Sequence, residues 1–366
     1  MSTHNVPETF SIPVGPLHVA LEEPMYFKID VQGETVSHID INAGHAHRGI
    51  EYLTTKRTMY QNVVLTERIC SLCSNSHPQT FAMAAEKIAG IEVPERGIYL
   101  RTVADEMKRV TSHLFNVALL VHLVGYETYF MHMMQVREIG QDMLESIFGN
   151  RQDIGAMCIG GVRYDLDDKS IAYIKGALDK IEAETKDIIK TFKTNGSILR
   201  RTKGVGVLTH ADAITCGVVG PVARASGVDY DVRREAPYAA YDRLPLVVHS
   251  LTDGDVWSRA MVRLEEILTS IDLLRVCLRD LPGGPVNIND RPDIPPGQAV
   301  TRSEAPRGEV IYYLRTNDTP QPERVKWRVP TFMNWDSLRF MLQDAKVADI
   351  AMIVNSIDPC LSCTER

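Results

Sequence analysis

Four of the seven cysteines form two Cys-x-x-Cys pairs near opposite ends of the chain, Cys70 with Cys73 and Cys360 with Cys363. A separation of three residues brings two sulfurs to the same side of a turn, where both can bind one metal. One pair is a weak signal, but two pairs that the fold brings together offer four thiolates to a soft metal. The spacing alone leaves structural zinc, an iron–sulfur cluster or another soft metal as alternatives.

The remaining cysteines, Cys158, Cys216 and Cys277, stand alone in the sequence. We expect them to be small apolar core residues. In a reducing cytosol, an odd number of cysteines with two close pairs favours metal binding or redox work over a disulfide framework.

The residues around both pairs narrow the choice of metal. The segments RICSLCSNSH (68–77) and DPCLSCTER (358–366) resemble the two nickel-binding motifs of the large subunit of NiFe-hydrogenases. The resemblance continues through HRGIE (47–51) and EAPRG (304–308), so it covers essentially the full length. Further similarity, in GPLH (15–18), GPVARASG (220–227) and PY (237–238), is shared with the quinone-pocket large subunit of respiratory complex I. This combination implies the energy-converting, membrane-associated branch of these hydrogenases.

The resemblance implies a role for several individual residues. Cys70, Cys73, Cys360 and Cys363 match the four nickel ligands, and Cys73 and Cys363 match the pair that also binds an iron carrying CO and two cyanides. The residues that match those lining these small ligands are Arg307, Pro330 and Thr331. A guanidinium over an open metal site can stabilise charge or help to polarise H2, although outside this context Arg307 would be a salt-bridge residue.

His77 follows Cys73 by four residues, a spacing suited to a hydrogen bond to a bridging sulfur. Without the motif it would more simply be a helix-packing residue. Glu23, in the segment LEEP (21–24), aligns with the family's proton-gating glutamate. That role suits a buried carboxyl group with a raised pKa, which can relay protons near neutral pH. The alternative is that Glu22 and Glu23 are exposed charges at a strand edge.

Two departures from the family pattern concern the metal ligands' surroundings. Ser71 stands where a glycine is usual, and Arg366 stands where relatives have a histidine. In many relatives that histidine and the glutamate matching Glu51 hold a further cation, Mg or Fe. The replacement by Arg366 weakens the expectation of this second site at Glu51.

The resemblance also implies a reaction and partners. The reaction is the reversible conversion of protons and electrons into H2, with electrons from reduced ferredoxin. Once four cysteines bind nickel, no iron–sulfur motif remains, so a small subunit with a 4Fe–4S cluster is expected. A further ferredoxin-like cluster subunit, membrane antiporter-like subunits and a maturation protease are also implied. The alternative is a redox-silent structural or quinone-pocket subunit of a complex I-like assembly, whose homologues lack these cysteines.

Composition and charge exclude several other classes. Apolar residues make up 44% of the 366 residues and charged residues 24%, which is typical of a soluble globular chain. The net charge of −7, without a basic block, gives no support for nucleic-acid binding. The longest apolar candidate, 114–134, is interrupted by polar residues, and no secretory signal is evident. We therefore expect a cytoplasmic protein, peripheral on the inner face of the membrane through its partners.

The elements that must position these residues are mainly helical. We expect an α+β fold in one domain over 1–366, with a β-rich segment over 1–45, a bundle of long helices over 46–280, and a segment over 281–366 that closes the metal site. Alternation around the turn at 32–34 predicts a β-hairpin. Helical periodicity predicts helices over 50–60, 82–89, 97–124, 129–148, 168–192, 258–279, 334–342 and 347–355, and strands are expected over 309–315 and 324–329.

Overall fold

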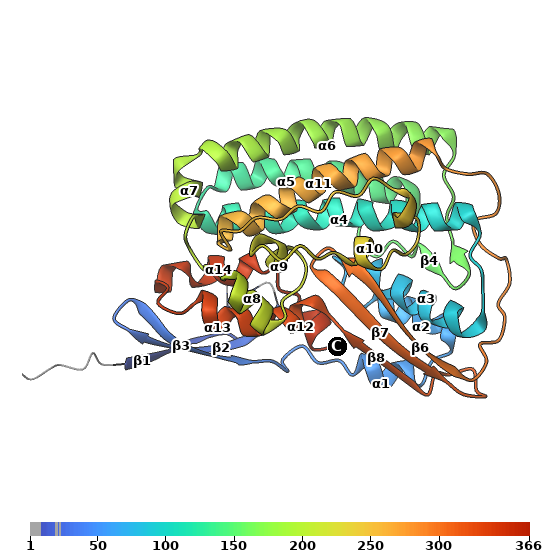
Figure 1. Ribbon diagram of the computed structural model, residues 1–366, viewed down its shortest axis with the longest axis horizontal. Helices are drawn as coiled ribbons and strands as arrows, with labels where there is room; N and C mark the ends of the chain where they lie inside the picture. The colour runs from blue at the N-terminus through green and yellow to red at the C-terminus, as the bar shows by residue number, and fades with distance from the viewer. Residues whose placement is uncertain (1–8, 19–20, 22) are drawn as a thin grey trace, which may run out of the picture.

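The computed structural model describes residues 9–18, 21 and 23–366, which form two layers (Figure 1). One layer is a bundle of long helices. The other contains two three-stranded sheets and most of the short helices. The bundle helices are α4 (Glu95–Val124), α5 (Glu127–Phe148), α6 (Asp168–Thr194) and α11 (Val256–Arg279). The expected α+β architecture is therefore confirmed.

The ends of the long helices follow from local sequence. The side chains of Asp167 and Asp255 accept hydrogen bonds from main-chain N–H groups in the first turns of α6 and α11. Helices α4 and α5 end at Gly125 and Gly149, both in the left-handed conformation that glycine adopts without a steric penalty. Because α4 is buried on nearly every side between 101 and 114, it forms the centre of the molecule.

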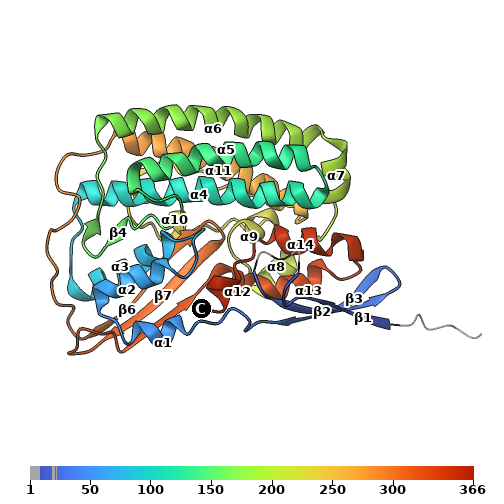
Figure 2. The same cartoon turned by 180° about the vertical axis from the view of Figure 1, so that it is seen from behind.

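The N-terminal sheet projects from one end of the molecule (Figures 1 and 2). It is antiparallel, in the order β1 (Thr9–Val14), β2 (Tyr26–Gln32) and β3 (Thr35–Asn42). The predicted hairpin corresponds to β2 and β3, which a turn at Gly33 connects. Phe27, Ile29 and Val31 alternate inward and are buried, as the pattern predicted.

The second sheet contains β6 (Gly297–Ala305), β7 (Gly308–Thr316) and β8 (Arg324–Arg328) in that order, all antiparallel. Strands β7 and β8 confirm the prediction, whereas β6 was not expected. Helix α3 (Ser76–Ala89) packs against β6 and β7. Two short antiparallel strands of two residues each, β4 (Met157–Cys158) and β5 (Gly161–Val162), lie below the bundle.

The predicted helix over 50–60 is wrong in one respect, because the structure has two helices there, α1 (Ile50–Thr54) and α2 (Met59–Glu67). Thr58 starts α2 with a reciprocal capping box to Gln61, which forces an extended residue between the helices. The predicted helix over 82–89 begins earlier, at Ser76. The predicted segments 334–342 and 347–355 are helical, each formed by short α- and 3-10-helices in direct succession.

The remaining short helices connect the layers. They are α7 (Gly196–Thr202), α8 (His210–Cys216), α9 (Pro221–Ala225), α10 (Val232–Glu235), η1 (Tyr241–Arg243), α12 (Pro330–Asn334), η2 (Trp335–Ser337), α13 (Leu338–Met341), η3 (Val347–Asp349), α14 (Ile350–Ser356) and α15 (Leu361–Thr364). Within the described part of the chain, no helix has both the length and the apolar character that crossing a bilayer requires. Cys277 is buried as predicted, but Cys158 and Cys216 are only partly buried.

Candidate metal centre

The two cysteine pairs meet inside the molecule. Cys70 and Cys73 lie in the turn between α2 and α3, while Cys360 and Cys363 lie at and within the short helix α15. All four are buried, and their Sγ atoms lie within 4.8 Å of one another. The Sγ atom of Cys360 is 3.2 Å from that of Cys70 and 3.0 Å from that of Cys363. These separations exceed a disulfide bond, so the cluster is a set of four free thiols with the donor chemistry of a soft-metal site.

The protonation of the cluster is uneven. Hydrogen bonds from the Cys360, Cys363 and Cys70 thiols lower the pKa of Cys73 well below its ordinary value, despite burial. Burial raises the pKa of Cys363 well above that value. One thiolate therefore forms readily at Cys73, and binding of a cation would be needed to deprotonate all four sulfurs together.

His77 connects the cluster to the sheet. Its Nε2 atom lies 3.3 Å from Sγ of Cys363, and its Nδ1 atom lies 2.7 Å from the hydroxyl of Tyr312 on β7. Burial raises the pKa of Tyr312 well above its ordinary value, so the phenol stays protonated and is able to donate to Nδ1. In the tautomer in which it does so, the ring proton lies on Nε2, facing the sulfur. His77 therefore contacts Cys363 and also helps to lower the pKa of its sequence neighbour Cys73; that either sulfur bridges two metals stays a prediction.

Arg307, in the turn between β6 and β7, is buried beside the C-terminal pair. Its Nε donates to the main-chain oxygen of Asp358 at 2.8 Å, and Nη2 to Oδ1 of the same residue at 2.7 Å. Burial alone would lower the pKa of Arg307, but Asp358 and the nearby thiols outweigh it and raise that pKa. Asp358 has a φ of 56°, so the arginine fork supports a left-handed residue two positions before Cys360.

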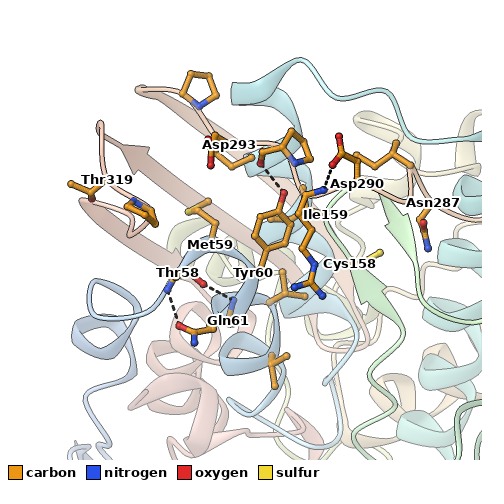
Figure 3. Close-up of a pocket in the computed structure, with 18 of the residues that line it drawn as sticks. Thr58, Met59, Tyr60, Gln61, Cys158, Ile159, Asn287, Asp290, Asp293 and Thr319 are labelled. Atoms are coloured by element: carbon orange, nitrogen blue, oxygen red, sulfur yellow. Dashed lines mark hydrogen bonds between the residues drawn. The ribbon is translucent and has the colours of Figure 1, made fainter.

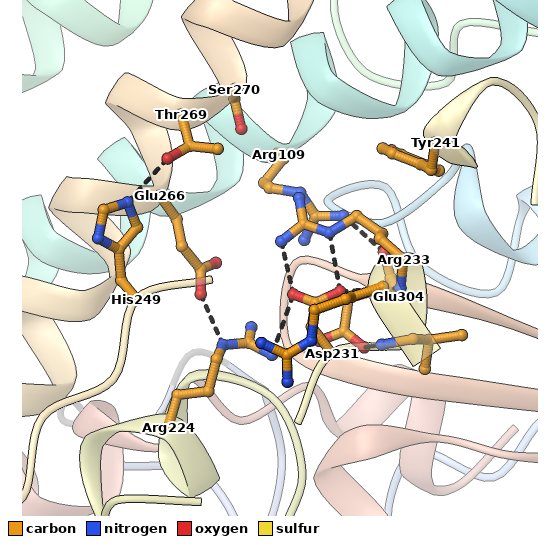
Figure 4. A network of polar contacts seen from close by, with 12 residues as sticks. Arg109, Arg224, Asp231, Arg233, Tyr241, His249, Glu266, Thr269, Ser270 and Glu304 are labelled. Carbon is orange, nitrogen blue, oxygen red and sulfur yellow. Dashed lines mark hydrogen bonds and ion pairs between the residues drawn. The ribbon is translucent and has the colours of Figure 1, made fainter. Parts of the chain in front are cut away.

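A buried ion-pair network holds the segment that carries Arg307 (Figure 4). Nη1 of Arg224 lies 2.9 Å from Oε1 of Glu304, and Nη2 of Arg109 donates to the main-chain oxygen of Glu304 at 2.6 Å. The backbone also approaches closely here, because a Cβ atom at Gly220 would lie 2.2 Å from the main-chain oxygen of Arg307. The main chain that carries Arg307 is thus held by Arg109 of the bundle and by Gly220 and Arg224 at α9.

Thr331 and Pro330 lie at the start of α12, next to the C-terminal pair. The main-chain N–H of Cys360 donates to Oγ1 of Thr331 at 3.1 Å, which leaves the hydroxyl hydrogen of Thr331 to donate elsewhere. Pro330 occupies the first turn of α12, a position that needs no main-chain donor. Both residues are buried.

Glu23 contacts the two residues that lie between the cysteines of the C-terminal pair. One oxygen, Oε2, accepts from the main-chain N–H groups of Leu361 at 2.6 Å and Ser362 at 2.8 Å, and Oε1 accepts from the hydroxyl of Ser362. The side chain is partly buried. Glu23 is therefore not a simple exposed charge, whereas Glu22, the other carboxyl of this segment, lies outside the described residues.

The surroundings of Glu51 do not fit a second divalent cation. Its Oε1 atom lies 3.0 Å from Nε of Arg366, and its Oε2 atom lies 2.9 Å from Nζ of Lys326. Burial alone would raise the pKa of Glu51, but these two cations outweigh it and lower that pKa. The carboxylate is already neutralised by two side chains of the same protein.

Two residues that hydrogen-bond to the main chain around the cysteine pairs were not predicted from sequence. Nη2 of Arg48 donates to the main-chain oxygens of Ile69 at 2.8 Å and Ser362 at 2.9 Å, so one guanidinium joins the residues that precede Cys70 and Cys363. Lys108 of α4 is buried, and its Nζ donates to the main-chain oxygens of Ser71 and Gln152. Burial lowers the pKa of Lys108 to about 8. Arg48 lies in the HRGIE segment, which was the only sequence signal for either residue.

A separate groove of about 1440 Å³ opens between α2 and the loop over 287–296 (Figure 3). The hydroxyl of Tyr60 donates to the main-chain oxygen of Pro292 across it at 2.8 Å. None of the four clustered cysteines lines this groove. It therefore belongs to another surface of the molecule.

Comparisons with known proteins match both halves of the chain. A family model for the 49 kDa subunit of respiratory-chain NADH dehydrogenase matches residues 124–294 and 287–366, and a model for nickel-dependent hydrogenases matches residues 48–123. The carbon monoxide-induced hydrogenase of Rhodospirillum rubrum is 62% identical over 359 residues, which are 98% of this chain and 99% of the relative. The membrane-bound hydrogenase subunit alpha of Pyrococcus furiosus is 36% identical, over 97% of this chain and 87% of its own.

The similarity extends to three dimensions. One chain in the structure of the membrane-bound sulfane sulfur reductase, described as an archaeal respiratory membrane complex, superposes with a TM-score of 0.93 at 31% identity. The match covers 99% of this chain and 100% of that one. The whole described fold, and not one motif, is therefore shared.

Proposed function

The chain belongs to the family that joins the large subunits of NiFe-hydrogenases, in their energy-converting branch, to the 49 kDa subunit of complex I, and from this premise we propose that it catalyses reversible H2 formation from protons and electrons. The observation that carries the proposal is the cluster of four buried thiols from both ends of the chain. A set of cysteines that was exposed to solvent, or that had fewer than four members, would not support this proposal.

In the proposal, Cys70, Cys73, Cys360 and Cys363 would hold nickel, and Cys73 and Cys363 would also hold an iron with CO and cyanide ligands. This centre supplies the redox chemistry by which protons and electrons combine. Arg307, Pro330 and Thr331 would line the small ligands, and the Arg307 guanidinium and the Thr331 hydroxyl are the donors that could hydrogen-bond to them. Four soft thiolates in a buried site suit nickel, and charge from Arg307 and Lys108 offsets part of the negative charge.

The chain's own residues also handle the proton. His77 holds one proton on Nε2 against Cys363, and Tyr312 keeps it there by donating to Nδ1. Glu23 touches the main chain between Cys360 and Cys363 and is partly exposed, so it can carry a proton between this segment and solvent. Glu23 is the only carboxylate within the described residues for which a bond to Leu361 and Ser362 is found.

The proposal includes partners. Electrons require an acceptor within tunnelling distance, so a small subunit with a 4Fe–4S cluster and a further ferredoxin-like cluster subunit would complete the path from reduced ferredoxin. Relatives include a membrane-bound hydrogenase subunit and a chain of a respiratory membrane complex. We therefore place this chain on the inner face of the membrane, attached through antiporter-like partner subunits that translocate ions.

A second candidate is a redox-silent subunit of a complex I-like assembly, which the match of residues 124–294 and 287–366 to the 49 kDa model favours. The four thiols argue against it. A silent subunit would gain nothing from four buried cysteines whose proton equilibria are strongly perturbed, together with an arginine fork and a histidine aimed at them.

The deciding experiment is metal analysis of the purified complex together with infrared spectroscopy. We expect nickel and iron in equal amounts at this chain, bands of CO and cyanide bound to iron, and H2 evolution with reduced ferredoxin. Zinc alone, without such bands, would instead identify a structural site. Loss of the bands in Cys363→Ser, with the Cys216→Ser protein unchanged, would link them to the cluster.

A further inference from the structure

The side chain of Arg366 lies among oxygen atoms beside the cysteine cluster. Its Nε donates to Oε1 of Glu51 at 3.0 Å, Nη1 to the main-chain oxygen of Thr364 at 3.0 Å, and Nη2 to the main-chain oxygen of Trp327 at 2.8 Å. The guanidinium carbon lies 5.7 Å from the centre of the Trp327 ring. The side chain is only 13% exposed. Every nitrogen of the guanidinium thus has an oxygen partner.

The three oxygens come from different parts of the chain. Glu51 belongs to α1, Trp327 to β8 and Thr364 to the C-terminal segment, which lies beside α1 in both views (Figures 1 and 2). A carboxylate and two carbonyl oxygens are the hard donors that Mg²⁺ and Mn²⁺ prefer, and the set contains no sulfur or nitrogen. We call these three atoms the oxygen cage.

We propose that the oxygen cage is a cation site that the protein fills with its own Arg366, and that removing the guanidinium turns it into a site for a hydrated divalent metal ion. In the wild-type protein a metal ion is excluded by like charge. The guanidinium is within hydrogen-bonding distance of all three oxygens, and Nζ of Lys326 lies 2.9 Å from the second oxygen of Glu51.

The cage is connected to the cluster through packed aromatic rings. Trp327 stacks on Tyr312 with ring centres 5.3 Å apart, and Tyr312 hydrogen-bonds to His77, which contacts Cys363. The guanidinium of Arg366 therefore joins the C-terminal segment to α1 and β8, next to the aromatic residues that support His77 and, through it, Cys363. This inference concerns the oxygen cage alone, and it holds whether or not the cluster binds nickel.

The test uses the full chain with Mn²⁺ as the probe, followed by electron paramagnetic resonance, and thermal unfolding in EDTA or in excess Mg²⁺. The wild-type protein is expected to unfold at the same temperature in both. Arg366→Ala should unfold at a lower temperature in EDTA, recover with Mg²⁺, and bind Mn²⁺ at least about ten-fold more tightly than wild type, because the cation inside the cage is gone and only Lys326 remains beside Glu51. Arg324→Ala removes an exposed cation from β8 and should behave as wild type.

Adding Glu51→Gln to Arg366→Ala should abolish the gained Mn²⁺ binding. Two results would overturn the proposal: wild-type protein that binds Mn²⁺ through Glu51, or a folded Arg366→Ala protein that gains no Mn²⁺ binding. If the alanine variant does not fold, Arg366→Gln removes the charge while it keeps a hydrogen-bonding side chain. Stabilisation of that variant by Mg²⁺ supports the proposal, and no stabilisation contradicts it.

Discussion

Replacing Arg307 with lysine tests how the two hydrogen bonds from the Arg307 guanidinium to Asp358 affect turnover at the proposed metal centre. The guanidinium makes two short contacts, at 2.8 Å to the main-chain oxygen and 2.7 Å to Oδ1 of Asp358. The single nitrogen of lysine can keep one of them while the positive charge remains. The loss is therefore one charge-assisted hydrogen bond in a buried site, which costs about 1.5–3 kcal/mol.

The lost bond also supports the left-handed backbone of Asp358, a conformation that costs about 1–3 kcal/mol in a non-glycine residue. If about 2–3 kcal/mol of the loss falls on the transition state, turnover drops roughly 30- to 160-fold. All four thiols and the charge remain, so we expect nickel content and the CO and cyanide bands to be retained.

The assay compares H2 evolution, nickel content and infrared bands of Arg307→Lys and wild type, with denaturant unfolding of both. Arg315→Lys is the matched control, because Arg315 lies on β7 with an exposed partner, Glu323, and surface pairs contribute little. Wild-type turnover in Arg307→Lys would refute the reasoning. Loss of the bands would show that Arg307 maintains the iron ligands and does not only lower the barrier.

Three further changes have distinct expected outcomes. Cys73→Ser should abolish H2 evolution and lower nickel content, since a hydroxyl is a poor ligand for nickel, whereas Cys216→Ser should stay within a few-fold; nickel retention with normal turnover would remove Cys73 from the ligand set. Glu23→Gln can still accept from Leu361 and Ser362 but cannot carry a proton, so H/D exchange with solvent should fall while nickel stays bound; unchanged exchange would point to another path. Burial raises the pKa of Asp105 to about 7 from 3.8, so the contribution of its protonated carboxyl group to stability is full below about pH 4 and is lost as the pH rises through about 7. Asp105→Asn should therefore reduce the pH dependence of the free energy of unfolding over that range by up to about 1.4 kcal/mol per pH unit, as measured by denaturant unfolding; a pH dependence equal to that of wild type would contradict the raised pKa of Asp105.

Periodicity predicted the long helices because their apolar stripes are regular and their caps are strong. The predicted 168–192 and 258–279 differ from α6 and α11 by only two residues at an end. The break before α2 was missed because the capping residues Thr58 and Gln61 lie inside an otherwise helical pattern. Strand β6 was missed because only some of its inward positions are apolar, while Ser303 and Glu304 are buried through polar contacts.

The site was predicted unevenly for a physical reason. Cysteine spacing and flanking motifs identify ligands, but hydrogen bonds to main-chain oxygens leave no pattern in a sequence. Arg48 and Lys108 act through such bonds. Lys108 also lies on a helix that is buried on nearly every side, so a charged residue in its sequence does not indicate which face is exposed. The pairing of Arg366 with Glu51 likewise required the third dimension, although the departure at Arg366 was visible.

The distance between the cysteine pairs along the chain has a consequence for synthesis. Cys70 and Cys360, whose sulfurs touch, are 290 residues apart in sequence. At about 5–20 residues per second, a ribosome needs roughly 15–60 s to make the second pair after the first. During that interval a metal ion arriving at Cys70 and Cys73 meets only two sulfurs and an open surface. Because the four-sulfur enclosure exists only after Cys363 has been made, a metal ion that requires all four sulfurs can bind only after both pairs have been synthesised.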